Sequence, residues 1–300
     1  MDDVPEDVSV QSGMRRIRLD LAYDGTDFSG WARQPGLRTV QGVLEETMAT
    51  ILRRYPPHPV LYVAGRTDAG VHATGQVAHV DLATDQLRSL RRRGAPAGIG
   101  EAELAQLLGQ RINGVLGADS DVVVRSSTLA PEGFDARFSA IWRRYRYRVA
   151  DAAAEHDPLE RRRTVRHPTE LDVEAMDTAA RALLGLHDYA TFCKPRPHST
   201  TIRTLRSFAW RRQADGVLIA SLEADAFCHS MVRSLVGATV AVGDGSLSGD
   251  DVVRLRDEGQ RTGEFLVMPA KGLTLTEVGY PAAGDFATRA EQTRARRELI

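Results

Sequence analysis

One aspartate stands out in the chain because of the short, glycine-bracketed segment that contains it. Residues 65–70 read GRTDAG, so a single residue separates Arg66 from Asp68. An ionised carboxylate can serve as a nucleophile, and a nearby guanidinium can keep it ionised in a desolvated pocket. Aspartates between glycines also form simple turns by accepting hydrogen bonds from local N–H groups. The segment is therefore a candidate catalytic loop, with turn formation as the alternative.

The residues on either side of this loop predict the scaffold that holds it. Residues 60–63 (VLYV) are an apolar run typical of a buried strand. Beyond the loop, Val77, His79 and Asp81 alternate with smaller or apolar residues, which is the pattern of a strand with two different faces. We therefore expect Arg66 and Asp68 in a connection between two strands, a common place for catalytic groups.

A second candidate region is residues 143–148, RRYRYR. Alternation along a strand would separate its two tyrosines from three of its arginines: Tyr145 and Tyr147 on one face, and Arg144, Arg146 and Arg148 on the other. Charge on an edge strand can simply protect that edge from pairing. An aromatic side chain supported by cations can instead bind nucleic acid. FDARFS, which precedes this segment, adds Arg137 as a possible phosphate ligand.

Two further side chains have both a structural and a functional interpretation. Arg233 lies in residues 227–242, an apolar stretch that predicts a helix, and an isolated charge there needs a partner. A surface position is the alternative for Arg233. Trp31 follows the turn signal at residues 24–26 and lies near Arg33 and Gln34. A tryptophan in such a loop can stack on a base or can anchor the loop to the core.

These segments together resemble the motifs of TruA-type tRNA pseudouridine synthases, the tRNA pseudouridine(38-40) synthase family. The segment GRTDAGVHATGQVAHV is similar to the catalytic segment of that family. Further similarity, in family order, covers these segments: YDGTDFSGWARQ, FDARFSAIWRRYRY, GLHDYATF, AFCHSMVR and KGLTLTEVGY. The resemblance spans residues 15–281 and leaves out the two tails and the Arg91 loop.

The resemblance implies an α+β protein with the pseudouridine synthase fold: two antiparallel or mixed-sheet subdomains, helices packed on the sheet, and a central RNA-binding cleft. It implies that Asp68 is the nucleophile and that Tyr145 contacts the target base. It also places Arg233 near Asp68, with Arg66 as the alternative partner. The further residues that we expect to contact substrate are Arg137, Arg144, Arg146, Trp31 and Leu275. The implied partners are tRNA, modified at uridines 38 to 40 of the anticodon arm, and a second copy of the chain.

The domain organisation follows from composition and periodicity. We expect a disordered tail at residues 1–14, an N-terminal subdomain at 15–138, a C-terminal subdomain at 139–281, and a flexible tail at 282–300. Residues 86–100 form a basic loop containing Gly and Pro, which we interpret as an insertion of unknown role. Apolar residues at helical spacing predict helices near residues 40–52, 101–116 and 172–184.

Composition limits the classes of protein that fit. The formal net charge is −1, but the positive charge is almost all arginine, and it clusters at residues 15–18, 91–93, 143–148, 161–166 and 203–206. Such clusters permit RNA binding. Cys193 and Cys228 form no zinc or CxxC pattern, so we expect no disulfide framework and a reducing cytosol. We also expect no membrane span, and no signature of a metal or nucleotide cofactor is present.

Isomerising uridine moves neither hydride nor phosphate, so it needs a carboxylate and a flipped base rather than a cofactor. The carboxylate could attack the sugar C1′ or the base C6. Two other classes of protein also fit the motifs. A retaining glycosidase would need a second carboxylate about 5 Å away, which Asp24 or Asp27 could supply. An RNA-binding protein without catalysis would not need Asp68.

Overall fold

The structure is a computed structural model that describes residues 13–91, 98–196, 200–282 and 284–294. It contains ten strands: β1 (Met14–Tyr23), β2 (Leu61–Val63), β3 (His72–Ala83), β4 (Val122–Leu129), β5 (Trp142–Ala150), β6 (Val165–Arg166), β7 (Gly185–Asp188), β8 (Ile202–Arg212), β9 (Leu218–Ala224) and β10 (Leu273–Gly279). Its helices are α1 (Val40–Ile51), α2 (Thr84–Ser89), α3 (Glu101–Leu116), α4 (Val173–Ala182), α5 (Met231–Gly243), α6 (Gly249–Glu258) and α7 (Phe286–Arg294). Three short 3-10 turns are η1 (Pro158–Glu160), η2 (Ala190–Phe192) and η3 (Ala270–Gly272).

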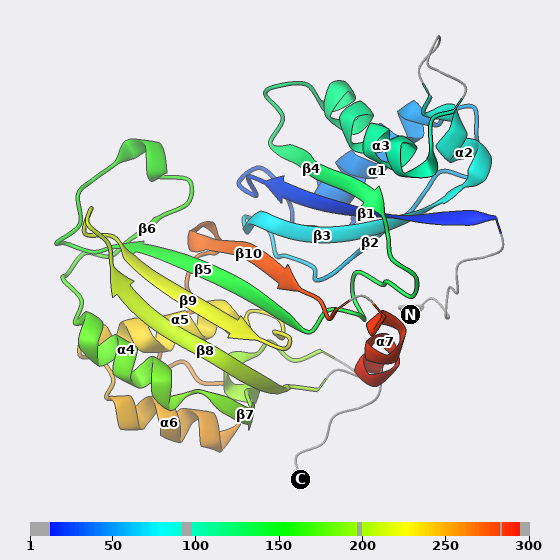
Figure 1. The fold of residues 1–300 in the computed structure, drawn as a ribbon. Helices are drawn as coiled ribbons and strands as arrows, with labels where there is room; N and C mark the ends of the chain where they lie inside the picture. Colours follow the sequence, from blue (N-terminus) through cyan, green and yellow to red (C-terminus); the bar gives the residue numbers. More distant parts are fainter. Residues whose placement is uncertain (1–12, 92–97, 197–199, 283, 295–300) are drawn as a thin grey trace.

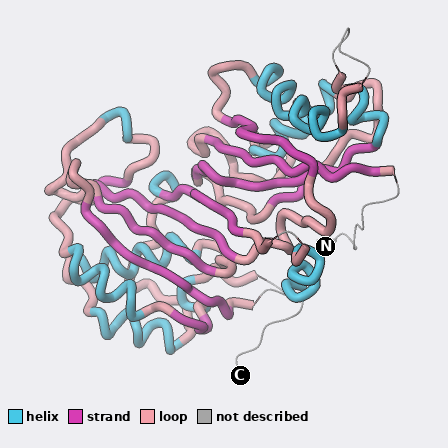
Figure 2. The backbone as a smooth tube through the Cα atoms, viewed as in Figure 1, coloured by secondary structure: helices cyan, strands magenta, loops and turns pink. Residues whose placement is uncertain are grey.

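The strands form one mixed sheet that runs through both halves of the molecule (Figures 1 and 2). Its order is β4-β1-β3-β10-β5-β9-β8-β7, with β2 added beside β3 and β6 beside β5. β10 joins the two halves, because it pairs parallel to β3 and antiparallel to β5. The two sheets predicted from the sequence are therefore halves of a single mixed sheet, and the α+β assignment is confirmed at this level.

The helices pack against the two halves separately. In Figure 1, α1, α2 and α3 gather beside β1 to β4, whereas α4, α5 and α6 cover the half that contains β8 and β9. Side chains cap several of them: Thr39 accepts from the Gly42 N–H at the start of α1, and Asp172 accepts from the Glu174 and Ala175 N–H groups at the start of α4. The apolar stripes predicted for these helices face the sheet and form the core.

Three predicted elements differ from the structure. The helix predicted from residue 227 begins only at Met231, because Ser230 has a left-handed backbone conformation with φ of 67°. Part of the predicted 86–100 loop is helical, since α2 covers residues up to Ser89, and residues 92–97 lie outside the described chain.

The C-terminal tail is also more ordered than predicted. α7 forms there, and Phe286 packs in the core with its ring centroid 5.5 Å from that of Phe134. Most of the predicted N-terminal tail lies outside the described residues. In the part of the chain that is described, no helix is long and apolar enough to cross a membrane.

Candidate active site

The Asp68 carboxylate lies in the loop between β2 and β3 and meets two basic side chains from the other half of the chain. Nη2 of Arg233 lies 3.3 Å from its Oδ2, and Nε2 of His229 lies 3.4 Å from its Oδ1. Both distances exceed the roughly 2.7–2.9 Å typical of tight charge-assisted bonds. The Asp68 side chain keeps 31% of its surface exposed. The carboxylate is thus held by basic groups but remains open to a ligand.

Residues of the N-terminal half hold this loop in place with hydrogen bonds. The Trp31 N–H donates to the carbonyl of Thr67 at 3.0 Å, and the Tyr23 hydroxyl lies 2.8 Å from the Thr67 hydroxyl. Gly30 lies so close that a Cβ there would be 3.0 Å from the same carbonyl, and its φ of 97° also favours glycine. The side chain of Gln76 donates to the Gly65 carbonyl. The YDGTDFSGW segment, residues 23–31, therefore packs against the loop that carries Asp68 and is hydrogen-bonded to it.

Arg233 lies in the first turn of α5, where its guanidinium reaches three acceptors. Besides Asp68, it donates to the carbonyl of Met268 and to the hydroxyl of Ser230, both at 3.2 Å. The predicted contact between Arg233 and Asp68 is confirmed. The physical expectation behind it holds for the two Nη atoms, which have acceptors, whereas the buried Nε has no hydrogen-bond partner among the described residues.

Tyr145 lies close to this cluster. Its ring packs edge-on against Phe227 with centroids 5.2 Å apart, and the side chain is largely buried. Burial, helped by neighbouring Tyr23 and by the negative charge of Asp68, raises the pKa of Tyr145 well above its usual value. Tyr145 therefore carries its hydroxyl proton throughout the physiological range, which makes it a neutral hydrogen-bonding and packing group.

The structure places two of the predicted substrate contacts in the core. Trp31 is 1% exposed and Leu275 is 0% exposed, so neither presents a face to RNA. The predicted stacking role of Trp31 is replaced by the anchoring alternative. Leu275 is opposite Tyr145 in β5 and beside Ala73 in β3, and these neighbours cover it on both sides. The sequence reveals the positions of both residues but not the depth at which they lie.

Arg66 and Arg137 form an exposed basic pair beside the loop. Burial and the positive charge of Arg66 lower the pKa of Arg137, which indicates that the two guanidinium groups are near each other. Arg66 therefore lies next to Arg137, whereas the contact with Asp68 is made by Arg233. This arrangement leaves two cations available to an anion at the mouth of the loop.

The arginines of β5 differ in their environments. Arg144 pairs with Glu223 at 2.8 Å and with Glu277, and it stacks over Trp142. Arg148 donates to Thr164 and pairs with Glu160. Arg146 is the exposed one of the outer row. Arg143 lies on the opposite face and is only 9% exposed. The expectation that the whole basic cluster at residues 143–148 could bind RNA is therefore wrong for Arg143.

His229 was not predicted as a site residue, although it lies within the AFCHSMVR segment. Burial is the main cause that lowers its pKa, with the nearby cations adding to the effect and Asp68 opposing it. The ring is therefore neutral at pH 7. The spacing of His229 and Arg233, at i and i+4, would have suggested a shared direction in a continuous helix. In the structure Ser230 interrupts that helix, so His229 lies before α5 and Arg233 within it, and both side chains reach Asp68.

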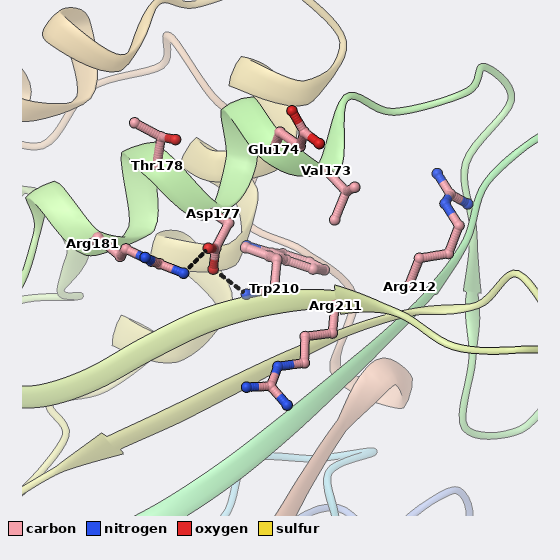
Figure 3. Close-up of a pocket in the computed structure, with 8 residues that line it drawn as sticks. All are labelled: Val173, Glu174, Asp177, Thr178, Arg181, Trp210, Arg211 and Arg212. Carbon is pink, nitrogen blue, oxygen red and sulfur yellow. Dashed lines mark hydrogen bonds and ion pairs between the residues drawn. The ribbon is translucent and has the colours of Figure 1, made fainter.

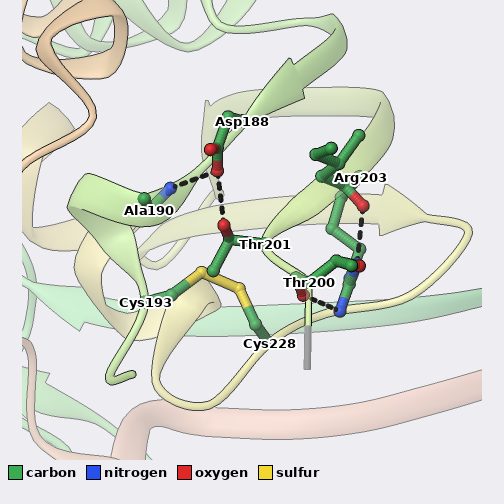
Figure 4. The surroundings of a disulfide bond; sticks show 8 residues. Asp188, Ala190, Cys193, Thr200, Thr201, Arg203 and Cys228 are labelled. Carbon is green, nitrogen blue, oxygen red and sulfur yellow. Dashed lines mark hydrogen bonds between the residues drawn. A yellow bond between two sulfur atoms is a disulfide. The ribbon is translucent and has the colours of Figure 1, made fainter. Parts of the chain in front are cut away.

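Next to His229, the two cysteines form a disulfide, contrary to the expectation that they would not (Figure 4). Cys193 follows η2 and Cys228 precedes α5, and their Cα atoms lie 5.7 Å apart. The backbone N–H of Lys194 also donates to the carbonyl of His229 at 2.9 Å. The sequence could not predict this pairing, because 35 residues separate the cysteines and only the fold brings them together.

The carboxylates proposed for a glycosidase have other partners. Asp24 accepts from the hydroxyl of Thr26 and lies 3.1 Å from His72, and both Asp24 and Asp27 face Arg162. In the described residues, the side chains that bind the Asp68 carboxylate are Arg233 and His229, neither of which is an acid. Asp24 and Asp27, the carboxylates suggested as the second acid of a retaining hydrolase, are therefore engaged by other groups.

Among the described residues, no group of three or more His, Cys, Asp or Glu side chains could hold a metal ion. A separate shallow hollow lies between α4 and β8 (Figure 3), where Asp177 binds the Trp210 N–H and pairs with Arg181. It contains none of the predicted site residues. The candidate site is therefore the Asp68 cluster.

Comparisons with known proteins agree with the motifs. A family model described as tRNA pseudouridine synthase matches residues 179–281. The chain is 62% identical to tRNA pseudouridine synthase A of Leifsonia xyli over 285 residues, which cover 95% of this chain and 98% of that protein. It is 50% identical to the Streptomyces avermitilis protein of the same name, with 97% and 96% covered, and 47% identical to that of Mycobacterium leprae, with 93% and 94% covered. With motifs, site and full-length similarity in agreement, the chain belongs to the tRNA pseudouridine synthase A family.

Proposed function

We propose that this protein isomerises uridine to pseudouridine at positions 38 to 40 of the tRNA anticodon stem-loop, with Asp68 as the nucleophile. The observation that carries the proposal is the partly exposed Asp68 carboxylate, held between Arg233 and His229. Arg233 supplies the positive charge beside this carboxylate, and an accessible carboxylate oxygen is what nucleophilic attack on a nucleotide requires.

The overall reaction defines what the other residues must do. The N1–C1′ bond breaks and a C5–C1′ bond forms, while a proton leaves C5 and one is gained at N1, so nothing is hydrolysed, oxidised or reduced. Arg233 balances the negative charge of Asp68. Tyr145, which remains protonated, packs against the uracil and offers its hydroxyl to it. The neutral His229 keeps the second carboxylate oxygen oriented without adding charge.

Binding requires that the target nucleotide leave its stack. We assign Arg66 and Arg137 to the phosphate of the flipped nucleotide, because both are exposed beside the Asp68 loop. In this proposal the 15–138 and 139–281 subdomains form the two walls of an RNA-binding cleft. Arg146 adds positive charge on the outer face of β5.

The decisive experiment is to incubate the protein with an unmodified tRNA transcript and map the pseudouridines formed. Pseudouridine at positions 38 to 40, absent with the Asp68→Asn variant, is the expected result. Release of free uracil would instead establish a hydrolase. Tight tRNA binding without either product would establish an RNA-binding protein that lacks catalysis.

The family resemblance also supports a homodimer, and a tRNA substrate supports action in the cytoplasm. Sedimentation equilibrium tests the first inference directly: a dimer has about twice the 32.9 kDa mass of the chain. A mass equal to one chain at micromolar concentration would exclude a stable dimer.

A further inference from the structure

Arg143 is a buried arginine that touches three separate segments of the site. It shares the inward face of β5 with Tyr145 and Tyr147. Its Nη1 donates to the carbonyl of Asp225 at 2.8 Å, and its Nη2 donates to the carbonyls of Ala64 at 2.8 Å and Arg137 at 3.1 Å. The printed hydrogen-bond partners of this guanidinium are therefore main-chain carbonyls.

Each of those carbonyls belongs to a segment with a proposed site residue. Ala64 directly follows β2 and precedes the Asp68 loop, and a Cβ on its neighbour Gly65 would lie 4.0 Å from Nε of Arg143. The second carbonyl belongs to Arg137 itself. Asp225 begins the segment that leads through Phe227 and His229 to Arg233. The three segments come from both halves of the chain, at separations of 79, 6 and 82 residues from Arg143.

We propose that Arg143 is a positioning residue that fixes the Asp68 loop, the Arg137 turn and the Asp225–Arg233 segment relative to Tyr145, and that it does not bind RNA. The proposal rests on the proposed function for its kinetic test. A planar guanidinium has donors that point in several fixed directions, so it can satisfy three carbonyls at once. A lysine at the same place keeps the charge but lacks that geometry.

The test compares Arg143→Lys and Arg143→Met with a matched control, Arg212→Lys. Arg212 also donates to main-chain carbonyls, those of Gly216 and Leu171, and it pairs with Asp151. Arg212 is in β8 and pairs with Leu218 at the start of β9, whereas Asp225 follows the other end of β9. The control therefore measures what the loss of a guanidinium fork costs away from the site.

We expect the single-turnover rate at saturating tRNA to fall about tenfold in Arg143→Lys and about 100-fold in Arg143→Met, with tRNA affinity and its salt dependence unchanged. Arg212→Lys should retain the wild-type rate below its melting temperature. A weaker affinity with a shallower salt slope and a normal rate would instead make Arg143 a phosphate ligand, and the proposal would be wrong.

Amide hydrogen exchange tests the same proposal without relying on activity. In Arg143→Lys, exchange in residues 64–71 and 225–233 should accelerate at least about tenfold, whereas Arg212→Lys should leave both segments unchanged. If Arg143→Met does not fold, the lysine variant alone decides. Unchanged exchange and rate in Arg143→Lys would overturn the proposal. A wild-type protein that forms no pseudouridine would remove the proposed function, and exchange would still decide the positioning role.

Discussion

Strand β5 turns Arg143, Tyr145 and Tyr147 toward the interior and Arg144, Arg146 and Arg148 outward. The inward arginine donates to main-chain carbonyls, and Tyr145 lies near Asp68. Of the outward ones, Arg144 and Arg148 pair with glutamates, while Arg146 is exposed. Residues of the same type thus have two different tasks within one strand. In the proposed function, the inner face positions the groups around Asp68 and the outer face supplies charge at the surface.

Asp68→Asn has the largest expected effect, because it changes the carboxylate that lies near Tyr145 on the inner face of β5. An amide cannot act as the carboxylate nucleophile, so we expect the single-turnover rate to fall at least about 1,000-fold. The affinity for tRNA should stay within about twofold, because no phosphate contact is lost. Filter binding and single-turnover assays measure the two quantities. Retention of a tenth of the wild-type rate would remove Asp68 from the mechanism.

Arg233→Leu should reduce the rate about 100-fold, because Asp68 loses its cationic partner. Arg233→Lys should reduce it about tenfold, since the charge stays while the contacts to Met268 and Ser230 are rearranged. Arg254→Leu is the matched control: this arginine lies on α6 and pairs with Glu258 far from the cluster in sequence. A normal rate in Arg233→Leu would transfer the partner role to Arg66.

Acid should lower the free energy of unfolding through His79, a buried histidine of β3. Burial, reinforced by nearby Arg16, lowers the pKa of His79 to about 4, whereas an unfolded histidine titrates near about 6.5. Between these values the unfolded chain binds a proton that the folded chain does not, so stability falls as pH falls. From pH 7 to pH 5 this group should cost about 2 kcal/mol of unfolding free energy.

Urea unfolding at the two pH values measures this change. His79→Asn can keep an acceptor for the Ala136 N–H, which donates to Nδ1 of His79, and should lose about 2 kcal/mol of the pH dependence. An identical pH dependence in both proteins would mean that the pKa of His79 is the same in the folded and the unfolded chain.

The smallest effect that we predict concerns the outer face. Arg146→Gln should weaken tRNA binding by a few-fold and reduce the slope of log K against log salt by about one, without changing the rate at saturation. Arg144→Gln should have a smaller effect, since Glu223 and Glu277 already neutralise that arginine. Salt titrations of tRNA affinity compare the two. Equal, unchanged slopes would show that the outer face does not meet RNA.

The sequence predicted those parts of the site that depend on local spacing. The GRTDAG loop between strands follows from the hydrophobic pattern, and the alternation in β5 separated Tyr145 and Tyr147 from Arg144, Arg146 and Arg148. A cation in an apolar helix needs a partner, and the family resemblance implied that this partner of Arg233 is Asp68. Each of these inferences uses neighbours in the chain or the cost of burying a charge.

The parts that could not be predicted depend on contacts between distant segments. Trp31 and Leu275 have the same local pattern whether they face solvent or the core. Leu275 is buried where β10 lies between β3 and β5, whereas the ring of Trp31 packs near Tyr23 of β1, with centroids 6.0 Å apart. His229 lies outside the expected helix, because the left-handed residue Ser230 makes α5 begin at Met231 rather than near residue 227. The Cys193–Cys228 pairing likewise depends on tertiary structure alone.

The place of β10 in the sheet has a consequence for how the chain matures on the ribosome. This strand is the last of the sheet to be synthesised, yet it lies between β3 and β5, which are made much earlier. Until β10 leaves the exit tunnel, β3 and β5 each lack it as a neighbour, and the sheet is divided in two. Such late, long-range pairing slows folding and leaves strand edges exposed to aggregation. A nascent chain that stalls before residue 273 should therefore depend on chaperones, although every residue of the Asp68 cluster has already been made.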